Sequence, residues 1–208
     1  MSSNQPFVCN TPIAHVYIAT IPENVQFGSI APKQREEEIN ACAHERVKKE
    51  KYCAWKLLEY ALKHSFQLSL SELEFQKTER GKWITPSCHF SITHCGGVVA
   101  VAVSTEKVGV DVEKYSDKLR SASRRFLTEK ERLFLQTLKE SEQLDYLARK
   151  WTQKESIFKA FGEGSFAPSK IETDEYTTFT KTLENGYVLT VASNDVEQIR
   201  WYQNVNYL

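Results

Sequence analysis

The segment Gly109-Val110-Asp111-Val112-Glu113 places two carboxylates two residues apart among valines. Side chains alternate along a β-strand, so Asp111 and Glu113 are expected to share one face while the valines occupy the other. Carboxylate oxygens are the ligands that a hard divalent ion such as Mg²⁺ prefers. Taken alone, the pair is explained more simply as the solvated face of an amphipathic hairpin, so it predicts a metal site only together with further residues.

A second segment, residues 151–159 (WTQKESIFK), carries a glutamate where an apolar residue is expected. At 100° per residue Glu155 falls inside the apolar stripe of a predicted helix, and Lys159 follows one turn later. A carboxylate on a buried face is costly unless it is paired, hydrogen-bonded or bound to a metal. We therefore expect Glu155 to have a partner, whereas its neighbour Lys154 is expected to need none. The stripe consists of Leu144, Leu147, Trp151 and Phe158.

The two segments together predict a site that binds a metal ion and a pyrophosphate. Asp111, Glu113 and Glu155 supply three oxygen ligands for the metal, and Lys159 can stabilise charge on a phosphate. The simpler explanation of the second segment is an i,i+4 salt bridge between Glu155 and Lys159, worth roughly 0.3–0.5 kcal/mol. The co-occurrence of both segments favours the metal site over two independent surface features.

Composition restricts the class of protein. The chain has 208 residues, 41% of them hydrophobic, with 27 Lys and Arg residues against 27 Asp and Glu residues. This is enough apolar material for a large core, and zero net charge does not favour nonspecific nucleic-acid binding. The sequence has no apolar run of about 18 residues, the length that a membrane-spanning helix needs. The N-terminus does not resemble a secretory signal. We therefore expect a cytoplasmic, monomeric protein that contacts neither nucleic acid nor membrane. The five cysteines, which lack a CxxC pair, are expected to be free thiols; they are Cys9, Cys42, Cys53, Cys88 and Cys95.

Periodicity and turn residues predict an α+β fold. Helices are expected within 33–64, as one or two helices after Pro32, from Thr128 to about Lys139 behind a capping box, and from about Ser141 to Phe161. We expect strand 98–104 to pair with the acidic strand as an antiparallel hairpin through residues 105–107. Strands are expected at 15–21, 72–78, 82–84, 90–93, 98–104, 109–113, 172–182, 186–192 and 197–203.

The order of strand, helices and strands occurs twice. This repetition predicts two similar α+β halves, 1–105 and 106–208, with a seam near residue 105. The second half holds both acidic segments, so we expect it to carry the metal site.

The two segments resemble the signature motifs of the 4′-phosphopantetheinyl transferases, in the order and separation typical of that family. The resemblance spans about residues 33 to 165, and the length is similar to that of the larger, Sfp-like class, which looks like two fused copies of the short acyl-carrier-protein synthase fold. It implies a pseudo-dimeric fold with the active site at the seam. The first half, 1–105, would contact the nucleotide of coenzyme A, and the second, 106–208, would carry the metal site and the catalytic helix. Asp111, Glu113 and Glu155 would bind Mg²⁺, or Mn²⁺ as an alternative. Glu155 and Lys159 would be the catalytic residues.

The same resemblance implies a coenzyme A site. Thr93-His94 is similar to the family's Ser-His pair, and Lys82 to the lysine of its Gly-Lys-Pro motif, with Trp83 in place of the proline. Arg35 is the best match to a basic residue for the 3′-phosphate, whereas Glu38 stands where another basic residue is often found. The implied contacts with coenzyme A come from Arg35, Lys82, Thr93, His94 and Lys159, and Lys48, Lys49 and Lys51 are alternatives for the 3′-phosphate.

The implied reaction transfers the 4′-phosphopantetheine arm of coenzyme A to a serine of an acyl or peptidyl carrier protein and releases adenosine 3′,5′-bisphosphate. Such carriers serve fatty-acid, polyketide or nonribosomal-peptide synthesis. An acidic carrier is expected to dock near Lys118–Phe126, a basic segment interleaved with apolar residues. A metal-dependent phosphohydrolase and a non-catalytic module that binds coenzyme A or a nucleotide remain alternatives. Turnover with a carrier protein would separate the three.

Overall fold

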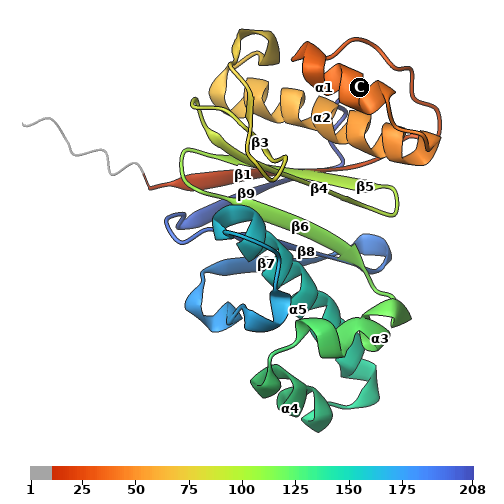
Figure 1. The fold of residues 1–208 in the computed structure, drawn as a ribbon, viewed down its shortest axis with the longest axis vertical. Coiled ribbons are helices and arrows are strands. Elements are labelled where there is room, and N and C mark those ends of the chain that lie inside the picture. Colours follow the sequence, from red (N-terminus) through yellow and green to blue (C-terminus); the bar gives the residue numbers. More distant parts are fainter. Residues whose placement is uncertain (1–10) are drawn as a thin grey trace, which may run out of the picture.

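The computed structural model describes residues 11–208 and consists of two β-sheets, each covered by helices on its outer side (Figure 1). The four-stranded sheet has the order β4-β5-β1-β9, and the three-stranded sheet has the order β6-β8-β7. The mixed α+β class expected from the sequence is confirmed. The strands of the two sheets are β1 (Ile13–Thr20), β4 (His89–Cys95), β5 (Val98–Ser104), β6 (Gly109–Lys114), β7 (Thr178–Leu183), β8 (Tyr187–Ala192) and β9 (Gln198–Gln203).

The helices expected within 33–64, after Thr128 and up to Phe161 lie close to their expected positions, whereas the helix at Asp117–Phe126 was not expected. Pro32 precedes the first helix, and the predicted capping box is present, since the Thr128 and Glu131 side chains exchange hydrogen bonds with each other's backbone N–H groups. The region 33–64 forms two helices. The helices are α1 (Lys33–Asn40), α2 (Glu45–Phe66), α3 (Asp117–Phe126), α4 (Glu129–Thr137) and α5 (Glu140–Phe161). A small hairpin of β2 (Gln76–Lys77) and β3 (Trp83–Ile84) precedes β4, and short 3₁₀ turns lie at Leu70–Glu72, Pro168–Lys170 and Thr173–Glu175.

Three apolar clusters hold the layers together. The first joins α2 to the outer face of the four-stranded sheet, and fully buried Trp55 and Leu58 lie in it. The second fills the space between the two sheets and includes Val110 and Val112 of β6. The third joins α3 and α5, with Phe126 buried beside Trp151. The valine side of the acidic strand therefore faces core, as its alternation predicts.

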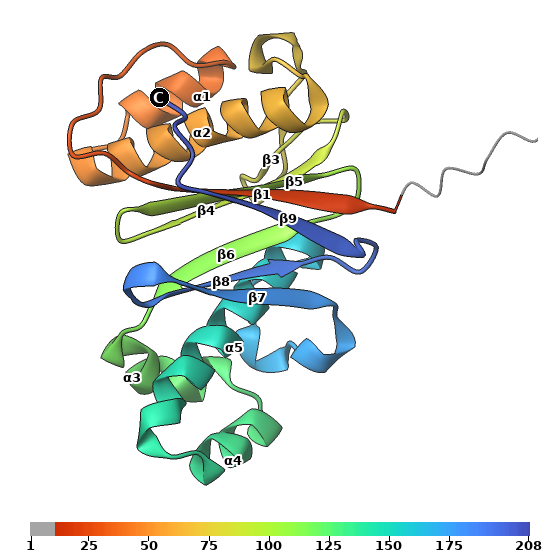
Figure 2. The ribbon, with the colours of Figure 1, turned by 180° about the vertical axis from the view of Figure 1, so that it is seen from behind.

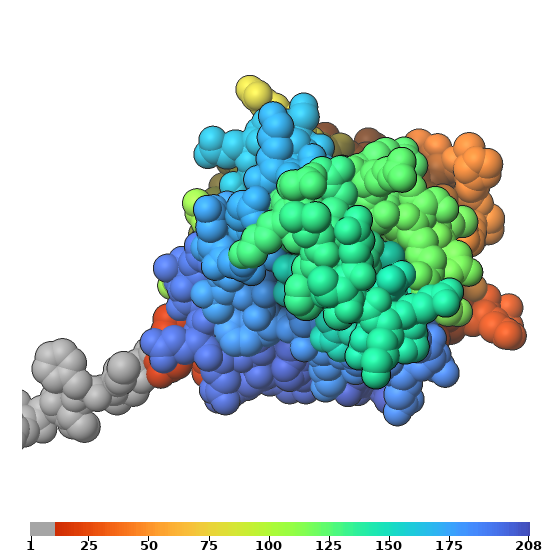
Figure 3. Space-filling view, turned by 90° about the horizontal axis from the view of Figure 1, so that it is seen from below, coloured from red at the N-terminus to blue at the C-terminus, as the bar shows by residue number. Residues whose placement is uncertain are grey.

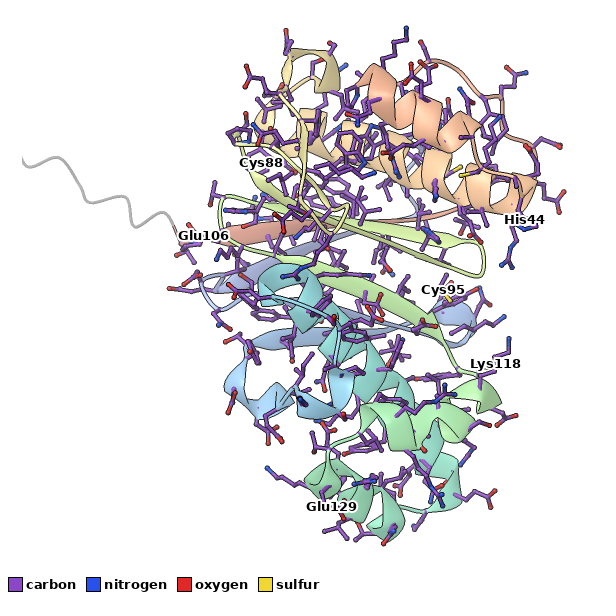
Figure 4. All side chains as sticks on the ribbon, in the orientation of Figure 1. His44, Cys88, Cys95, Glu106, Lys118 and Glu129 are labelled. Carbon is purple, nitrogen blue, oxygen red and sulfur yellow. The ribbon has the colours of Figure 1, made fainter. Side chains whose placement is uncertain are left out.

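The expected hairpin between 98–104 and the acidic strand is wrong. β5 pairs antiparallel with β4 and with β1, and β6 pairs antiparallel with β8 in the other sheet. Residues 105–108 carry the chain from one sheet to the other, and Glu106 of this crossover is labelled in Figure 4. Both edges of β5 are already occupied, which leaves no free edge for β6.

The last strand also lies outside its expected neighbourhood. β9 runs parallel to β1 at the edge of the four-stranded sheet, as the view from behind shows (Figure 2). Residues 198–203 therefore share a sheet with the N-terminal strands, although the predicted boundary at residue 105 assigns them to the second half. The Asn185-Gly186 pair between the expected strands 172–182 and 186–192 predicts a second hairpin. This one is confirmed, because β7 and β8 pair antiparallel around it, with φ of 59° at Asn185 and 76° at Gly186.

Helix α5 packs against the sheet mainly through small residues, although Leu147 of the stripe expected from the sequence is buried as well. Ala148, Thr152 and Ser156 are fully buried, and Thr152 Oγ1 lies 2.8 Å from Thr190 Oγ1 of β8. Trp151 and Phe158 are only half-buried. A helix with small residues on this face can approach the sheet closely, and the close approach brings Glu155 and Lys159 near β6.

Lys154 is fully buried, contrary to the expectation that it needs no partner. Its Nζ donates to Glu131 Oε2 at 2.9 Å, to Pro168 O at 3.0 Å and to Ile171 O at 2.6 Å. Burial lowers its pKa, and the charge of Glu131 opposes that effect. The lysine thus ties α5 to the first turn of α4 and to the 168–171 segment.

The cysteines that the structure describes are free thiols, as expected. Cys53 and Cys88 are buried, and Cys42 and Cys95 are half-buried. Cys9 lies outside the described residues. Within residues 11–208, no helix combines the length and the apolar character needed to cross a bilayer.

Candidate active site

Asp111 is a buried carboxylate on the face of β6 that points away from the core between the sheets. Only 5% of its surface is exposed, so it does not lie on a solvated hairpin face. Its Oδ1 accepts hydrogen bonds from Lys159 Nζ at 2.7 Å and from Thr93 Oγ1 at 3.0 Å. Its Oδ2 is buried without a hydrogen-bond partner. Burial raises the pKa of Asp111, and the ammonium of Lys159 opposes the rise.

Glu113 lies two residues further along the same face and is half-buried. Its Oε1 accepts from Trp151 Nε1 at 3.2 Å, and its Oε2 accepts from Cys95 Sγ at 3.4 Å. Cys95 stands at the end of β4, next to β6 (Figure 4). Burial raises the pKa of Glu113, and the charge of Asp111 adds to the rise. The indole of Trp151 therefore orients the second carboxylate of the motif.

Glu155 supplies the third carboxylate from α5. Burial raises its pKa to about 7, the charges of Asp111 and Glu113 add to the rise, and Lys159 opposes it. The charge of Asp111 therefore raises the pKa of both Glu113 and Glu155, and the charge of Glu113 adds to the rise at Glu155. The sequence-predicted residues Asp111, Glu113, Glu155 and Lys159 are thus gathered between β6 and α5.

The acidic patch fits a hard divalent cation in its chemistry, although not as a ready-made cluster. Within residues 11–208, no group of three or more His, Cys, Asp or Glu side chains has the arrangement of a preformed metal site. The unpartnered Oδ2 of Asp111 and the mutual repulsion of the carboxylates are what a bound cation would relieve. Assignment of Asp111, Glu113 and Glu155 as metal ligands stays a prediction.

Gly109 explains how α5 comes so close to β6. A Cβ on this residue would lie 1.9 Å from Ser156 O and 2.7 Å from Ala160 N, both in the backbone of α5. Any larger residue must push the helix away from the strand. The glycine that opens the acidic motif is therefore a packing requirement of the helix that carries Glu155.

Replacing Gly109 with alanine should lower the free energy of unfolding by about 1–3 kcal/mol, because the backbone atoms it meets cannot rotate aside. Chemical denaturation measures this loss. Gly28→Ala is the matched control, since its Cβ would meet only Tyr52 Oη at 3.6 Å. Equal stabilities of the two variants would show that α5 does not depend on this contact.

A cleft of about 660 Å³ opens next to the acidic patch, between α2, the 78–82 turn, β4 and the end of α5. Its lining is rich in cations, which makes it suited to a ligand with several phosphates. Six basic residues line the cleft: four were predicted as coenzyme A contacts, Lys51 was an alternative, and Arg80 was missed. The six are Arg35, Lys51, Arg80, Lys82, His94 and Lys159.

Arg80 and Lys82 reach across the cleft from the turn between β2 and β3. Lys82 Nζ donates to Lys159 O at 2.6 Å, and Arg80 Nη1 donates to Gly162 O at 2.5 Å. The guanidinium of Arg80 also lies over the ring of Phe158. These carbonyls end α5, where cations are favoured. Arg80 could have been found from its place in the same turn as Lys82, but an isolated charge in a turn indicates only a solvated surface.

Arg35 and Glu38 form a network that involves the substituted Trp83. Glu38 Oε2 accepts from Arg35 Nη1 and from Trp83 Nε1, each at 3.2 Å, and Lys77 pairs with Glu38 Oε1. The Arg35 guanidinium lies over Trp55, 4.9 Å from the ring centroid. The two departures from the family pattern, an acid at 38 and a tryptophan at 83, are therefore hydrogen-bonded to each other.

The side chains of Thr93 and His94 lie in different surroundings: Thr93 contacts β6, and His94 lines the cleft. The Thr93 hydroxyl donates to Asp111 and accepts from Val112 N at 3.3 Å, and Ser91 Oγ accepts from Val110 N at 3.0 Å. These hydroxyls satisfy the free edge of β6. His94 lines the cleft instead. A contact of Thr93 with coenzyme A stays a prediction, whereas its bond to Asp111 links the acidic patch to β4.

Comparison with known proteins agrees with this site. The family model described as the 4′-phosphopantetheinyl transferase superfamily matches residues 107–201, which include both acidic segments. The chain is 28% identical to the 4′-phosphopantetheinyl transferase Sfp of Bacillus subtilis over 149 residues, 70% of this chain and 66% of that protein. It is 35% identical to the 4′-phosphopantetheinyl transferase gsp of Aneurinibacillus migulanus over 95 residues, 45% of this chain and 40% of the relative.

A human protein is also similar. The L-aminoadipate-semialdehyde dehydrogenase-phosphopantetheinyl transferase is 27% identical over 164 residues, 70% of this chain and 53% of that protein. Over residues 107–201 the chain is therefore similar to the 4′-phosphopantetheinyl transferase superfamily. The relatives Sfp and gsp make this similarity one to Sfp-like members. The matches span about two fifths to two thirds of the length of these curated relatives.

Proposed function

We propose that the chain transfers the 4′-phosphopantetheine arm of coenzyme A to a serine of an acyl or peptidyl carrier protein. The observation that carries the proposal is the junction at Lys159, whose ammonium pairs with Asp111 while its residue lines the cationic cleft. A diphosphate in the cleft would thereby lie next to the acidic patch. The similarity to the superfamily model and the activity for which the relatives are named support the same reaction.

In the proposed reaction the serine oxygen attacks the phosphorus that carries the pantetheine arm. The bond from that phosphorus to the bridging oxygen breaks, and adenosine 3′,5′-bisphosphate leaves with the bridging oxygen. Glu155 accepts the serine proton, directly or through a water. Lys159 stabilises the charge that develops on the diphosphate.

A divalent metal ion, when bound, would neutralise the diphosphate oxygens. Asp111, Glu113 and Glu155 are the residues we propose to hold Mg²⁺, with Mn²⁺ as an alternative. Trp151 and Thr93 then serve to orient two of the ligands through the hydrogen bonds described above.

We propose further that the two predicted halves, 1–105 and 106–208, share the substrate as a pseudo-dimer. Lys82 and His94 of the first half and Lys159 of the second line one cleft, which supports an active site at the seam. Each half has one helix of 22 residues against its sheet, α2 and α5. We also propose a monomer, and the four free thiols are in keeping with the reducing cytoplasm.

Incubation with coenzyme A, Mg²⁺ and an apo carrier protein tests the function. We expect mass spectrometry to find the phosphopantetheine arm on the carrier serine and an equal amount of adenosine 3′,5′-bisphosphate in solution. Release of the bisphosphate without a carrier would instead indicate a phosphohydrolase. Binding of coenzyme A without either product would indicate a non-catalytic module.

The 3′-phosphate of coenzyme A should increase affinity, because the cleft collects cations in a chain of zero net charge. Burial lowers the pKa of Lys82, and the neighbouring charges of Lys159 and Lys107 lower it further. A bound phosphate would relieve this repulsion. We expect coenzyme A to bind about tenfold more tightly than 3′-dephospho-coenzyme A, and Lys82→Ala to remove most of the difference.

Calorimetric titration with both ligands measures the effect. Lys63→Ala is the control, since Lys63 is exposed near the end of α2 and does not line the cleft. Equal affinities of the wild-type protein for the two ligands would count against a 3′-phosphate subsite.

The carrier protein is proposed to dock on α3. Lys118, Arg124 and Arg125 are exposed on this helix. The helix belongs to the green part of the surface seen from below (Figure 3), and Lys118 is labelled in Figure 4. Leu119 and Phe126 are buried in the core and do not contribute to this surface, contrary to the expected interleaving. Docking therefore depends on charge, which mainly raises the association rate and is screened by salt.

Reversing Arg124 and Arg125 to glutamate should raise the apparent KM for an acidic carrier by at least tenfold at low salt, with the affinity for coenzyme A unchanged. Steady-state kinetics and calorimetry measure the two quantities. The double variant Lys63→Glu and Arg200→Glu makes the same charge change at exposed positions of α2 and β9. An unaltered carrier KM would show that docking lies elsewhere.

A further inference from the structure

Glu50 is a carboxylate that the proposed mechanism does not use. It lies on α2 with 8% of its surface exposed, and its Oε2 is 3.4 Å from His94 Nδ1. Its Oε1 is 3.8 Å from Nε of Arg46, whose side chain is largely exposed. A nearly buried carboxylate is costly without a charged partner, so the contact with His94 is the one that justifies its position.

His94 lines the cleft from β4. Because Nδ1 is the ring nitrogen near Glu50, Nε2 is the one available for a ligand. In the neutral ring that carries its proton on Nδ1, Nε2 has a lone pair and repels an anion. In the protonated ring both nitrogens can donate, so Nε2 can bind a phosphate oxygen while Nδ1 stays in contact with Glu50.

The charges around His94 make protonation depend on an incoming anion. Burial lowers its pKa, Glu50 opposes the effect, and three cations reinforce it. The ring is therefore mainly neutral at neutral pH when the cleft holds no anion. A phosphate group among these cations would reverse the local field. The charged groups that act on His94 are Glu50 and Lys51 of α2, Arg35 of α1 and Lys159 of α5.

We propose that Glu50 and His94 form a proton-linked anion site, in which binding of a phosphate group of coenzyme A is accompanied by uptake of one proton from solvent at His94. Glu50 is the positioning residue, because its carboxylate fixes Nδ1 and compensates the imidazolium. The proposal rests on the proposed function for the identity of the ligand. It couples the affinity for coenzyme A to pH. Coenzyme A should bind more tightly as the pH falls through the range in which His94 titrates.

Calorimetry in two buffers of different ionisation enthalpy tests the coupling. We expect coenzyme A to bind wild-type protein at pH 7.5 with net proton uptake, and Glu50→Gln to bind about tenfold more weakly with uptake largely lost. Glu50→Asp should recover part of the uptake. Glu45→Gln removes an exposed charge from the same helix and should leave uptake unchanged. Binding with zero uptake by the wild-type protein would overturn the proposal.

Nuclear magnetic resonance of the His94 ring separates this proposal from the proposed function. Without coenzyme A, Glu50→Gln should lower the His94 titration midpoint, and inorganic pyrophosphate should raise the wild-type midpoint. The other four histidines of the chain serve as internal references. Failure of coenzyme A to bind, with both shifts present, would count against the function alone. Absence of both shifts would overturn the paired site.

Discussion

Replacing Lys154 with alanine should lower the free energy of unfolding by about 3–5 kcal/mol, although the residue touches no proposed substrate. The change removes three hydrogen bonds from a fully buried ammonium. It also leaves Glu131, whose side chain is 7% exposed, without its closest cation. A buried charge that loses its partner is among the most destabilising results of a single substitution. Chemical denaturation at pH 7 measures the loss.

The partner variants show whether the ion pair is the cause. Lys154→Met keeps the volume but not the charge, and should be nearly as unstable as Lys154→Ala. Adding Glu131→Gln to Lys154→Met should recover part of the loss, because the buried carboxylate is gone while an amide oxygen can still accept from Thr128 N. An exposed control is Lys130→Met, which breaks only a surface pair with Asp174. Stability of Lys154→Ala within 1 kcal/mol of wild type would contradict this account.

Local signals in the sequence predicted most of the elements. The capping box at Thr128, the glycine after α5 and the Asn185-Gly186 turn each specify a boundary through bonds to nearby backbone. Alternation in the acidic strand likewise predicted which side chains face the core. These features depend on residues within one or two turns of chain, so a single sequence carries them.

Strand pairing was predicted less well because it depends on distant residues. Proximity along the chain favoured a hairpin of β5 with β6, whereas β5 is flanked by β4 and β1, and β6 pairs with β8 some 80 residues later. The parallel pairing of β9 with β1 joins the two ends of the described chain. In neither pair are the two strands joined by a short turn, so no local sequence signal indicates the pairing.

The site residues that belong to sequence motifs were predicted, whereas those defined by contacts between distant segments were missed. The acids and Lys159 follow from spacing, but the burial of Lys154 does not. Its burial arises because α5 is covered on two sides, by the sheet along Ala148 and Ser156 and by the 168–171 segment over Lys154. A single apolar stripe cannot represent a helix of this kind. Arg80 was missed because its partner carbonyl, at Gly162, is 82 residues away.

Replacing Asp111 with asparagine should reduce kcat/KM by at least a thousandfold while leaving the fold as stable as before or more stable. Asparagine keeps an oxygen to accept from Thr93 and Lys159, but it removes the charge that we propose for the metal. Loss of one carboxylate also relieves repulsion on Glu155, whose pKa the charge of Asp111 raises. Kinetics in saturating Mg²⁺ and thermal denaturation measure the two effects.

The pH dependence of the free energy of unfolding is a second test of the Asp111→Asn variant. A carboxyl group whose pKa is raised by folding binds its proton more tightly in the folded state, so folding becomes less favourable as the pH rises through the interval between the unfolded and folded pKa values. Without metal, Asp111→Asn should therefore gain stability relative to wild type as the pH rises from 4 to 8. Asp174→Asn, an exposed control, should not follow this trend. Near wild-type turnover of Asp111→Asn would refute the metal assignment, and a large fall in its thermal midpoint would show that the carboxylate is needed for folding rather than for transfer.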